Sequence, residues 1–266
     1  MSSTDPDYED DDAALEASRM PLRAHLEELR SRLIKSTVVL MVLLVGGLFL
    51  KDLLLAVIAG PWTNARAAIE ASDGLDIGTL GQIKPHEQMV FAIKVSGVFA
   101  IIVGSPYYLA QAWGFIQSGL LQREKVAIHR SFPVAVGLFA AGLSFGYFVL
   151  VPMGLRFMLT FYGPEQIDIQ VTLNEYFSVL SALTVLMGFV FELPLLMWVV
   201  VRAGVMEAST LSSSRRTAFV IFLVFATLLT PPDPATQMLV AVPMYGLYEI
   251  GLRFAESAQK AFDEAI

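Results

Sequence analysis

The 266-residue sequence contains no cysteine and only three histidines, so several kinds of chemistry have no side chains to support them. Without cysteine, disulfides, thiolate metal sites and cysteine nucleophiles are excluded. The histidines are His25, His86 and His129, and the topology inferred below places them on alternating sides of a membrane. They therefore cannot form one metal cluster, and no serine has a histidine base at membrane depth. We expect neither an enzyme nor a bound cofactor.

Charged residues are also scarce, at 16% of the chain against about 25% in a soluble domain. The apolar residues, 55% of the total, come in long blocks. Residues 131–155 contain no charge, residues 176–201 contain only Glu192, and residues 89–122 contain only Lys94. A helix needs about 20 largely apolar residues to cross the hydrocarbon core of a bilayer. The sequence therefore predicts an all-α polytopic membrane protein.

Six apolar blocks are expected to be transmembrane helices, and the last two are short. The blocks cover residues 33–50, 89–112, 131–152, 174–201, 217–230 and 235–252. The uninterrupted apolar part of each short block extends only about 20 Å, at a rise of ~1.5 Å per residue. Either both short helices cross a locally thinned bilayer, or they form a re-entrant hairpin supported by the other helices. Both alternatives return the chain to the same side.

Lysine and arginine are distributed unequally among the loops. With an even number of crossings, thirteen of the 18 lie on the side of the chain ends, four lie on the other side, and Lys94 lies within a span. Cytoplasmic loops carry the excess of these residues, so both termini are expected in the cytoplasm. Seven acids and no base occur in the first 16 residues. We predict a disordered acidic tail over 1–20 and a C-terminal tail over 256–266.

The longest predicted connection, residues 51–88, lies on the extracytoplasmic side. It contains the potential helix breakers Pro61 and Pro85 and a helical-looking stretch at residues 64–71. We expect a structured cap over the outer ends of the spans rather than a separate domain.

A short amphipathic helix is predicted immediately before the first span. Leucines recur at spacings of four, three and four residues, which places them on one helical face: Leu22, Leu26, Leu29 and Leu33. Such a helix lies at the membrane interface. Glu28 has Arg32 four residues later, which by itself indicates a surface ion pair contributing about 0.2–0.5 kcal/mol. Glu124, in the loop over residues 113–130, by itself indicates a solvated charge.

Two polar residues are expected at membrane depth. Glu192 lies inside the fourth apolar block, two residues before Pro194. An ionisable side chain there costs about 2.5–3.5 kcal/mol on insertion scales, and such residues mark cavities or pathways. We therefore expect a polar cavity at Glu192, opening between the spans and the outer loops. Gln237, in the last block, is a weaker candidate because a buried amide often only bonds a neighbouring helix.

Several strings in this sequence resemble, in the same order, motifs of the TatC family of protein translocase subunits. They are HLEELRSRL at 25–33, PHE at 85–87 with Ile93 and Lys94, QAWGFI at 111–116, REK at 123–125, FELP at 191–194, LTPPD at 229–233, Gln237, PMY at 243–245 and EIG at 249–251. The agreement runs from about residue 21 to 255. The resemblance implies a six-helix membrane domain over 21–255, folded as a concave bundle in the bacterial inner membrane.

The resemblance also implies a function. Members of the family recognise signal peptides with consecutive arginines at the cytoplasmic face and help to move folded proteins with the proton-motive force. It implies partners of the TatB and TatA type, and self-association in a receptor complex. The residues that match the recognition site are Glu28 and Glu124, with His25, Leu29, Arg30 and Phe115 nearby. A second set matches the outer loop and the C-terminal hairpin: Pro61, Pro85, Lys94, Thr230, Pro231, Pro232 and Asp233.

Two other functions remain open on the residues alone. A proton-coupled secondary transporter could use Glu192 as its coupling site, and would need discontinuous helices and a midplane substrate site. A passive membrane scaffold would show no preference between Arg-Arg and Lys-Lys signals. We also expect contact with membrane lipid, and we expect no nucleic-acid partner.

Overall fold

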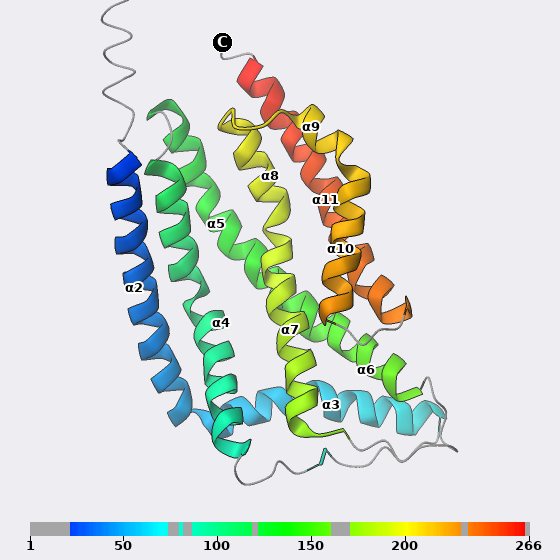
Figure 1. The fold of residues 1–266 in the computed structure, drawn as a ribbon. Helices are drawn as coiled ribbons and strands as arrows, with labels where there is room; N and C mark the ends of the chain where they lie inside the picture. The colour runs from blue at the N-terminus through cyan, green and yellow to red at the C-terminus, as the bar shows by residue number, and fades with distance from the viewer. Residues whose placement is uncertain are drawn as a thin grey trace, which may run out of the picture.

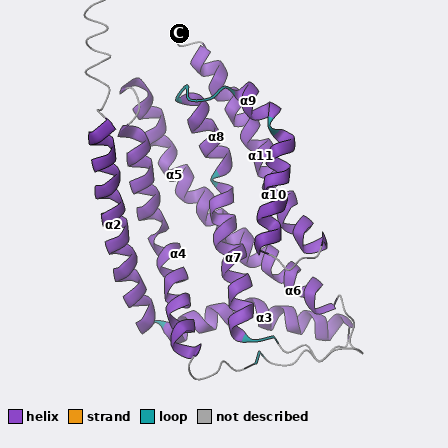
Figure 2. Cartoon of the chain, in the orientation of Figure 1, coloured by secondary structure: helices purple, strands orange, loops and turns teal. Residues whose placement is uncertain are grey.

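The computed structural model describes residues 22–73, 80–81, 87–118, 122–160, 171–229 and 234–263. Nearly all of these residues are helical (Figure 2). The helices in chain order are α2 (Leu22–Phe49), α3 (Lys51–Asp73), α4 (Glu87–Ser118), α5 (Gln122–Phe145), the π-helical turn η1 (Gly146–Leu150), α6 (Val151–Thr160), α7 (Leu173–Phe191), α8 (Leu193–Arg202), α9 (Ala208–Ser213), α10 (Arg215–Leu229) and α11 (Pro234–Asp263).

Four stretches of the described chain are long and apolar enough to cross a membrane. They are Arg23–Phe49, Gln88–Ser118, Arg130–Leu159 and Leu173–Arg202. These stretches correspond to the first four predicted spans, and the essentially all-helical character is confirmed. Crossing by α10, which has only 15 residues, and by α11 stays a prediction.

Most helices run lengthwise through the molecule, whereas α3 lies across one end (Figure 1). The start of α2 and the end of α11 both lie at the opposite end (Figure 1). We refer to these as the α3 end and the terminal end. The element order places the starts of α4 and α7 at the α3 end, where α3 packs against α4 and α6.

α2 is one continuous helix that joins the predicted interfacial helix to the first span. It packs chiefly against α4, and most of its remaining surface is exposed. The predicted leucine face belongs to this exposed surface, since Leu26 is 64% exposed and Leu33 is similarly open. In a membrane such a face contacts lipid or another protein. The position of α2 within the chain therefore depends on its contact with α4.

Two glycines allow α5 and η1 to pack closely against α7. A Cβ on Gly142 would lie 2.8 Å from the carbonyl carbon of Met187, and one on Gly146 would lie 2.7 Å from the Cα of Thr184. Small residues four apart let helix backbones approach within a membrane, where packing replaces the hydrophobic effect as the driving force. This contact holds the third and fourth candidate spans together.

Pro61 is a potential helix breaker by sequence, but α3 continues through it. Proline has no N–H, so the carbonyl of Val57 has no donor within the helix. The hydroxyl of Tyr147, in η1, donates to this carbonyl instead. The hydroxyl of Tyr176, in α7, donates to the next carbonyl, Ile58 O, at 2.8 Å. These two bonds anchor α3 across the end of the bundle, and the Tyr147 bond replaces the one that Pro61 removes from the helix.

A short main-chain contact also ties the chain after α3 to α7. The N–H of Gly81 donates to the carbonyl of Val171 at 2.9 Å, and the N–H of Leu173 donates back to Gly81. Thr172 and Glu175 then form a reciprocal capping box at the start of α7. Such a box satisfies two of the free donors at the first turn of a helix.

α11 extends beyond residue 255, where the membrane domain was predicted to end. It continues to Asp263, and Ala258 is fully buried against neighbouring elements. The side-chain oxygen of Gln259 accepts a hydrogen bond from the N–H of Ala208 at 3.3 Å. The segment predicted as a C-terminal tail is thus helical as far as residue 263. Its alanine, glutamate, glutamine and lysine residues favour helix strongly.

The glycine contact predicts a steric effect on stability. We expect Gly142→Ala to destabilise the fold by about 1–3 kcal/mol, because the added methyl group forces α5 and α7 apart. Thermal unfolding of the purified protein in detergent measures the loss. Gly137→Ala is the matched control, because a Cβ at Gly137 meets no atom within 4 Å. Equal unfolding temperatures for the two variants would contradict this account of the packing.

The α3 anchor predicts an interaction between two substitutions. We expect Tyr147→Phe to cost about 0.5–1.5 kcal/mol through loss of its hydrogen bond. In a Pro61→Ala background the residue at 61 supplies the missing N–H to Val57, so the same substitution should cost less. A double-mutant cycle on thermal unfolding tests this. Tyr176→Phe, whose acceptor Ile58 is not freed by the proline, should cost the same in both backgrounds.

Candidate functional site

Three helix ends come together at the terminal end of the molecule. α2 begins there and packs along α4, and α4 ends there at Ser118 (Figure 1). α5 begins four residues later at Gln122. The buried indole of Trp113 in α4 donates a hydrogen bond to the Ser131 hydroxyl of α5 at 3.2 Å. The fold thus brings together the segments that carry the predicted recognition residues.

Glu28 is held by an arginine on its own helix. The Nε and Nη2 atoms of Arg32 both donate to Glu28 Oε1, at 2.8 and 2.6 Å. The predicted ion pair across one turn is confirmed. The other carboxylate oxygen, Oε2, is buried and receives no direct hydrogen bond within the described residues, although the Ser118 hydroxyl, which donates to the carbonyl of Phe115, lies near the carboxylate. One carboxylate oxygen is therefore bound by Arg32, and the other is covered but retains the capacity to accept a further hydrogen bond.

Arg32 also connects α2 to α4, which makes it more than a local partner of Glu28. Its third nitrogen, Nη1, donates to the main-chain and side-chain oxygens of Gln111, at 3.4 and 3.3 Å. The guanidinium lies directly over Gly114, where an added Cβ would collide with Nη1 and lie 2.8 Å from Cζ. Only glycine leaves room for the arginine in this position.

His25 provides a second contact between the two helices. Its ring stacks on the ring of Phe115, with centroids 4.3 Å apart and planes inclined by 20°. The Nδ1 atom of His25 is buried and makes no hydrogen bond within the described residues. His25 lies one turn before Glu28 on the same helix, so both side chains face the end of α4.

The structure therefore gathers His25, Glu28 and Phe115 into one cluster. Leu29 and Arg30 lie on more exposed surface, and Arg30 has no ion pair with a described residue. The backbone at residue 124 belongs to the first turn of α5, but its side chain lies outside the described residues.

Sequence reasoning did not give Gln111 or Gly114 a role of their own. Both fall in the QAWGFI string at 111–116, which contributed to the family resemblance. Both contact Arg32, and Gln111 is 79 residues away from Arg32 in the sequence. No local periodicity reports such a contact, so the string was the sole signal available.

Glu192 occupies a break between two helices within the fourth candidate span. α7 ends at Phe191, α8 begins at Leu193, and Pro194 lies in the first turn of α8. The Glu192 side chain is 3% exposed, and its carboxylate makes no hydrogen bond to another side chain within the described residues, whereas the main-chain N–H of Phe139 in α5 lies near it. The carboxylate is thus buried by other parts of the same chain. The expected polar cavity stays a prediction.

Gln237 lies far from Glu192. α11 passes Pro194 at Gly251, where an added Cβ would be 3.1 Å from the Pro194 Cα. Gln237 precedes Gly251 by fourteen residues, which is about 21 Å along a helix. The two intramembrane polar residues thus lie at different levels and do not form one cluster.

The second predicted set is only partly described. Pro61 lies inside α3, and Lys94 in α4 donates to the Asn174 side chain of α7 at 3.1 Å. This bond links α4 and α7 near the α3 end. Pro85 and the hairpin residues 230–233 lie outside the described residues.

Residues 24–243 match the family model described as Sec-independent protein translocase protein (TatC). TatC of Desulforapulum autotrophicum is 32% identical over 237 residues, covering 89% of this chain and 84% of the relative. TatCy of Bacillus subtilis is 28% identical over 246 residues, covering 92% of each chain.

A solved structure agrees with these sequence matches. The crystal structure of the twin arginine translocase receptor TatC matches with a TM-score of 0.73 and 29% identity, covering 88% of this chain and 99% of that one. The family match contains the cluster around Glu28 and the break at Glu192. The chain therefore belongs to the TatC family, as a multi-pass bacterial membrane protein and a core component of the twin-arginine protein translocation system.

Proposed function

We propose that this chain binds twin-arginine signal peptides at its terminal end, where Glu28 and Glu124 accept the two guanidinium groups. The proposal rests on one observation, which is that the two oxygens of the Glu28 carboxylate have different surroundings. Oε1 is bound by Arg32, whereas Oε2 is buried without a charged partner among the described residues, and the Ser118 hydroxyl lies near the carboxylate. A guanidinium donates through a planar fork that suits a fixed carboxylate, which a lysine ammonium cannot reproduce.

The charges explain why a second carboxylate is needed. Arg32 compensates the charge of Glu28, so an incoming arginine meets a pair that is neutral overall. A neutral pair attracts a cation only weakly. A second carboxylate nearby gives the site the negative charge that it needs to bind two guanidinium groups. Glu124 follows α4 closely, in the first turn of α5, which is why we assign it this role.

Arg32, Gln111 and Gly114 act as positioning residues in this proposal. The hydrogen bonds from Arg32 to Gln111 hold the guanidinium against α4, and the guanidinium in turn fixes Glu28. Gly114 provides the space that this arrangement requires. A carboxylate held in one rotamer loses less side-chain entropy when it binds an arginine.

The two ion pairs supply specificity rather than most of the affinity. An exposed pair contributes about 0.2–1 kcal/mol, so two pairs give at most about 2 kcal/mol. The rest should come from the apolar stretch of the signal peptide lying against the spans, at roughly 25 cal/mol per Å² buried.

The wider assignment follows from charge and family. We infer that the chain crosses a bacterial inner membrane six times and has both termini in the cytoplasm. The excess of Lys and Arg on the terminal side supports this orientation. We further infer partners of the TatB and TatA type, self-association, and transport driven by the proton-motive force. We also propose that Glu192 meets a polar group of an inserted signal or partner helix, and the burial of its carboxylate without a side-chain partner among the described residues supports this.

A proton-coupled transporter is not proposed. The break at Glu192 supplies a discontinuous helix, but the translocase family match extends across residues 24–243 and includes that break.

Substitution of Glu28 tests the proposed function. We expect Glu28→Gln to reduce export of a folded twin-arginine reporter at least tenfold, and Glu28→Ala combined with Glu124→Ala to abolish it. The assay uses a strain lacking its own TatC, with immunoblots to show equal membrane insertion. Glu27→Gln removes the same charge from an exposed neighbouring position and should export normally. Normal export by the double variant would overturn the assignment.

Substitution of Gly114 tests the positioning role. We expect Gly114→Ala to displace the Arg32 guanidinium, release Glu28, and reduce crosslinking of a photoreactive twin-arginine peptide at least threefold. Gly97→Ala is the matched control, because it adds the same methyl group to α4 where no atom lies within 4 Å. If both variants crosslink as the unaltered protein does, Arg32 does not position the site.

A further inference from the structure

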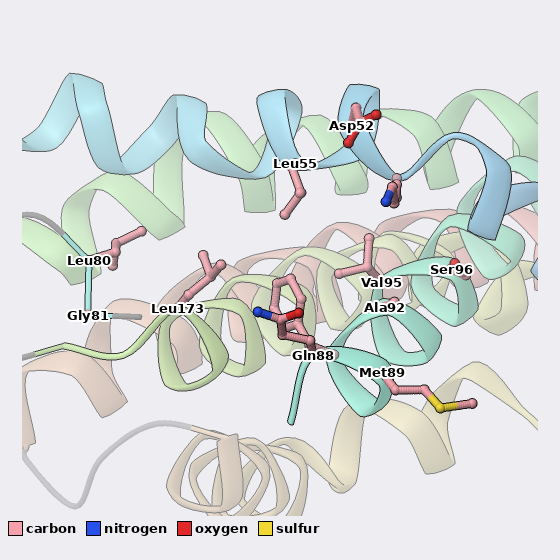
Figure 3. Close-up of a pocket in the computed structure, with 12 residues that line it drawn as sticks. Asp52, Leu55, Leu80, Gly81, Gln88, Met89, Ala92, Val95, Ser96 and Leu173 are labelled. Carbon is pink, nitrogen blue, oxygen red and sulfur yellow. The ribbon is translucent and has the colours of Figure 1, made fainter. Parts of the chain in front are cut away.

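A cavity of about 640 Å³ lies at the α3 end, far from the cluster around Glu28. Asp52 and Leu55 of α3 line one side, Gln88, Ala92 and Val95 of α4 line the opposite side, and the start of α7 contributes Leu173 (Figure 3). The volume is in the range of small-molecule sites, about 300–1,000 Å³. Most of the lining is apolar.

Two opposite charges stand at the edge of this cavity. Lys51 and Asp52 form the first turn of α3, directly after the first span, and both line the cavity. Both side chains are exposed, and neither has a hydrogen bond or ion pair with a described residue. The exposed amide of Gln88 adds a further polar group. The cavity therefore combines an apolar interior with a cation and an anion at its rim.

The surface around the cavity has the character of a lipid-facing surface. Phe49 and Met89 are 84% and 74% exposed, and Leu53 and Val90 beside them are also exposed. Phe49 and Leu53 flank Lys51 and Asp52 in the sequence, and Met89 lines the cavity together with them. Apolar side chains next to charged ones at a span end mark the boundary between acyl chains and headgroups. The cavity opens at this boundary.

We propose that the cavity binds one glycerophospholipid with an amine-bearing headgroup, from the leaflet on the side of α3. The Lys51 ammonium pairs with the phosphodiester, and the Asp52 carboxylate accepts hydrogen bonds from the headgroup ammonium. The upper part of an acyl chain lies along Leu55, Ala92 and Val95. Adjacent side chains of opposite charge match a phosphate and an amine that are separated by only two carbons.

The shape of the cavity favours a lipid over a partner helix. A helix packing along a span needs a groove that follows several turns of that span. Here the lining from α3 is confined to its first five residues and that from α4 to residues 88–96. A headgroup and the beginning of a chain fill such a space, whereas a transmembrane helix does not.

Native mass spectrometry of the full-length protein in mild detergent tests the proposal. The protein is incubated with equal amounts of phosphatidylethanolamine, phosphatidylcholine and phosphatidylglycerol that carry the same acyl chains. We expect phosphatidylethanolamine to be retained at least threefold over each of the others. Lys51→Gln combined with Asp52→Asn should remove this preference. Arg66→Gln is the control, because Arg66 lies on the same helix but pairs with Glu70. This variant should keep the preference for phosphatidylethanolamine.

A second variant distinguishes lipid binding in general from selectivity for the headgroup. Ala92→Leu extends a side chain into the cavity and should reduce retention of all three lipids, with thermal unfolding confirming that the protein is folded. Equal retention of the three lipids, stronger retention of the anionic lipid, or an unchanged pattern in the Lys51 and Asp52 variant would each overturn the proposal. Retention of a polypeptide in place of lipid would overturn it as well.

Discussion

The guanidinium of Arg32 lies between a carboxylate on its own helix and the oxygens of Gln111 on α4, and the candidate site depends on this interaction. α2 exposes most of its surface, so its contact with α4 is what fixes it within the chain. Arg32 secures that contact at the terminal end and orients Glu28 in doing so. Because the group is half-buried, its loss leaves a partly desolvated carboxylate without its partner, which costs more than loss of an exposed pair.

Glu192 presents the opposite situation, since its carboxylate is buried without a side-chain partner among the described residues. Burying an unpaired polar group is unfavourable, and a helix break next to Pro194 adds no stability of its own. Stability within the chain therefore gives no reason for a carboxylate here. The proposed contact with a group from another molecule gives one, and it requires the neighbouring helices to move apart because Glu192 is buried in the single chain. Gln237 lies about 21 Å away along α11 and supplies no such partner.

The sequence predicted what depends on composition and local spacing. Long apolar blocks predicted four of the described spans, and the four-residue separation of Glu28 and Arg32 predicted their ion pair. It did not predict that α3 continues through Pro61, because the compensating hydroxyl of Tyr147 is 90 residues away. It did not predict the role of Gly114 for the same reason. Local rules assess a residue within its own helix, whereas these contacts depend on where another helix lies.

The two ends of the molecule differ in how they are held. At the α3 end, side-chain bonds from Tyr147, Tyr176 and Lys94 join α3, α4 and α7. At the terminal end, the polar bonds of Arg32 and one stacked ring pair join α2 to α4. α2 has 28 residues, about 42 Å, and connects both ends as one helix. The proposed peptide site at the start of α2 and the proposed lipid site beyond its end are therefore joined by one helix.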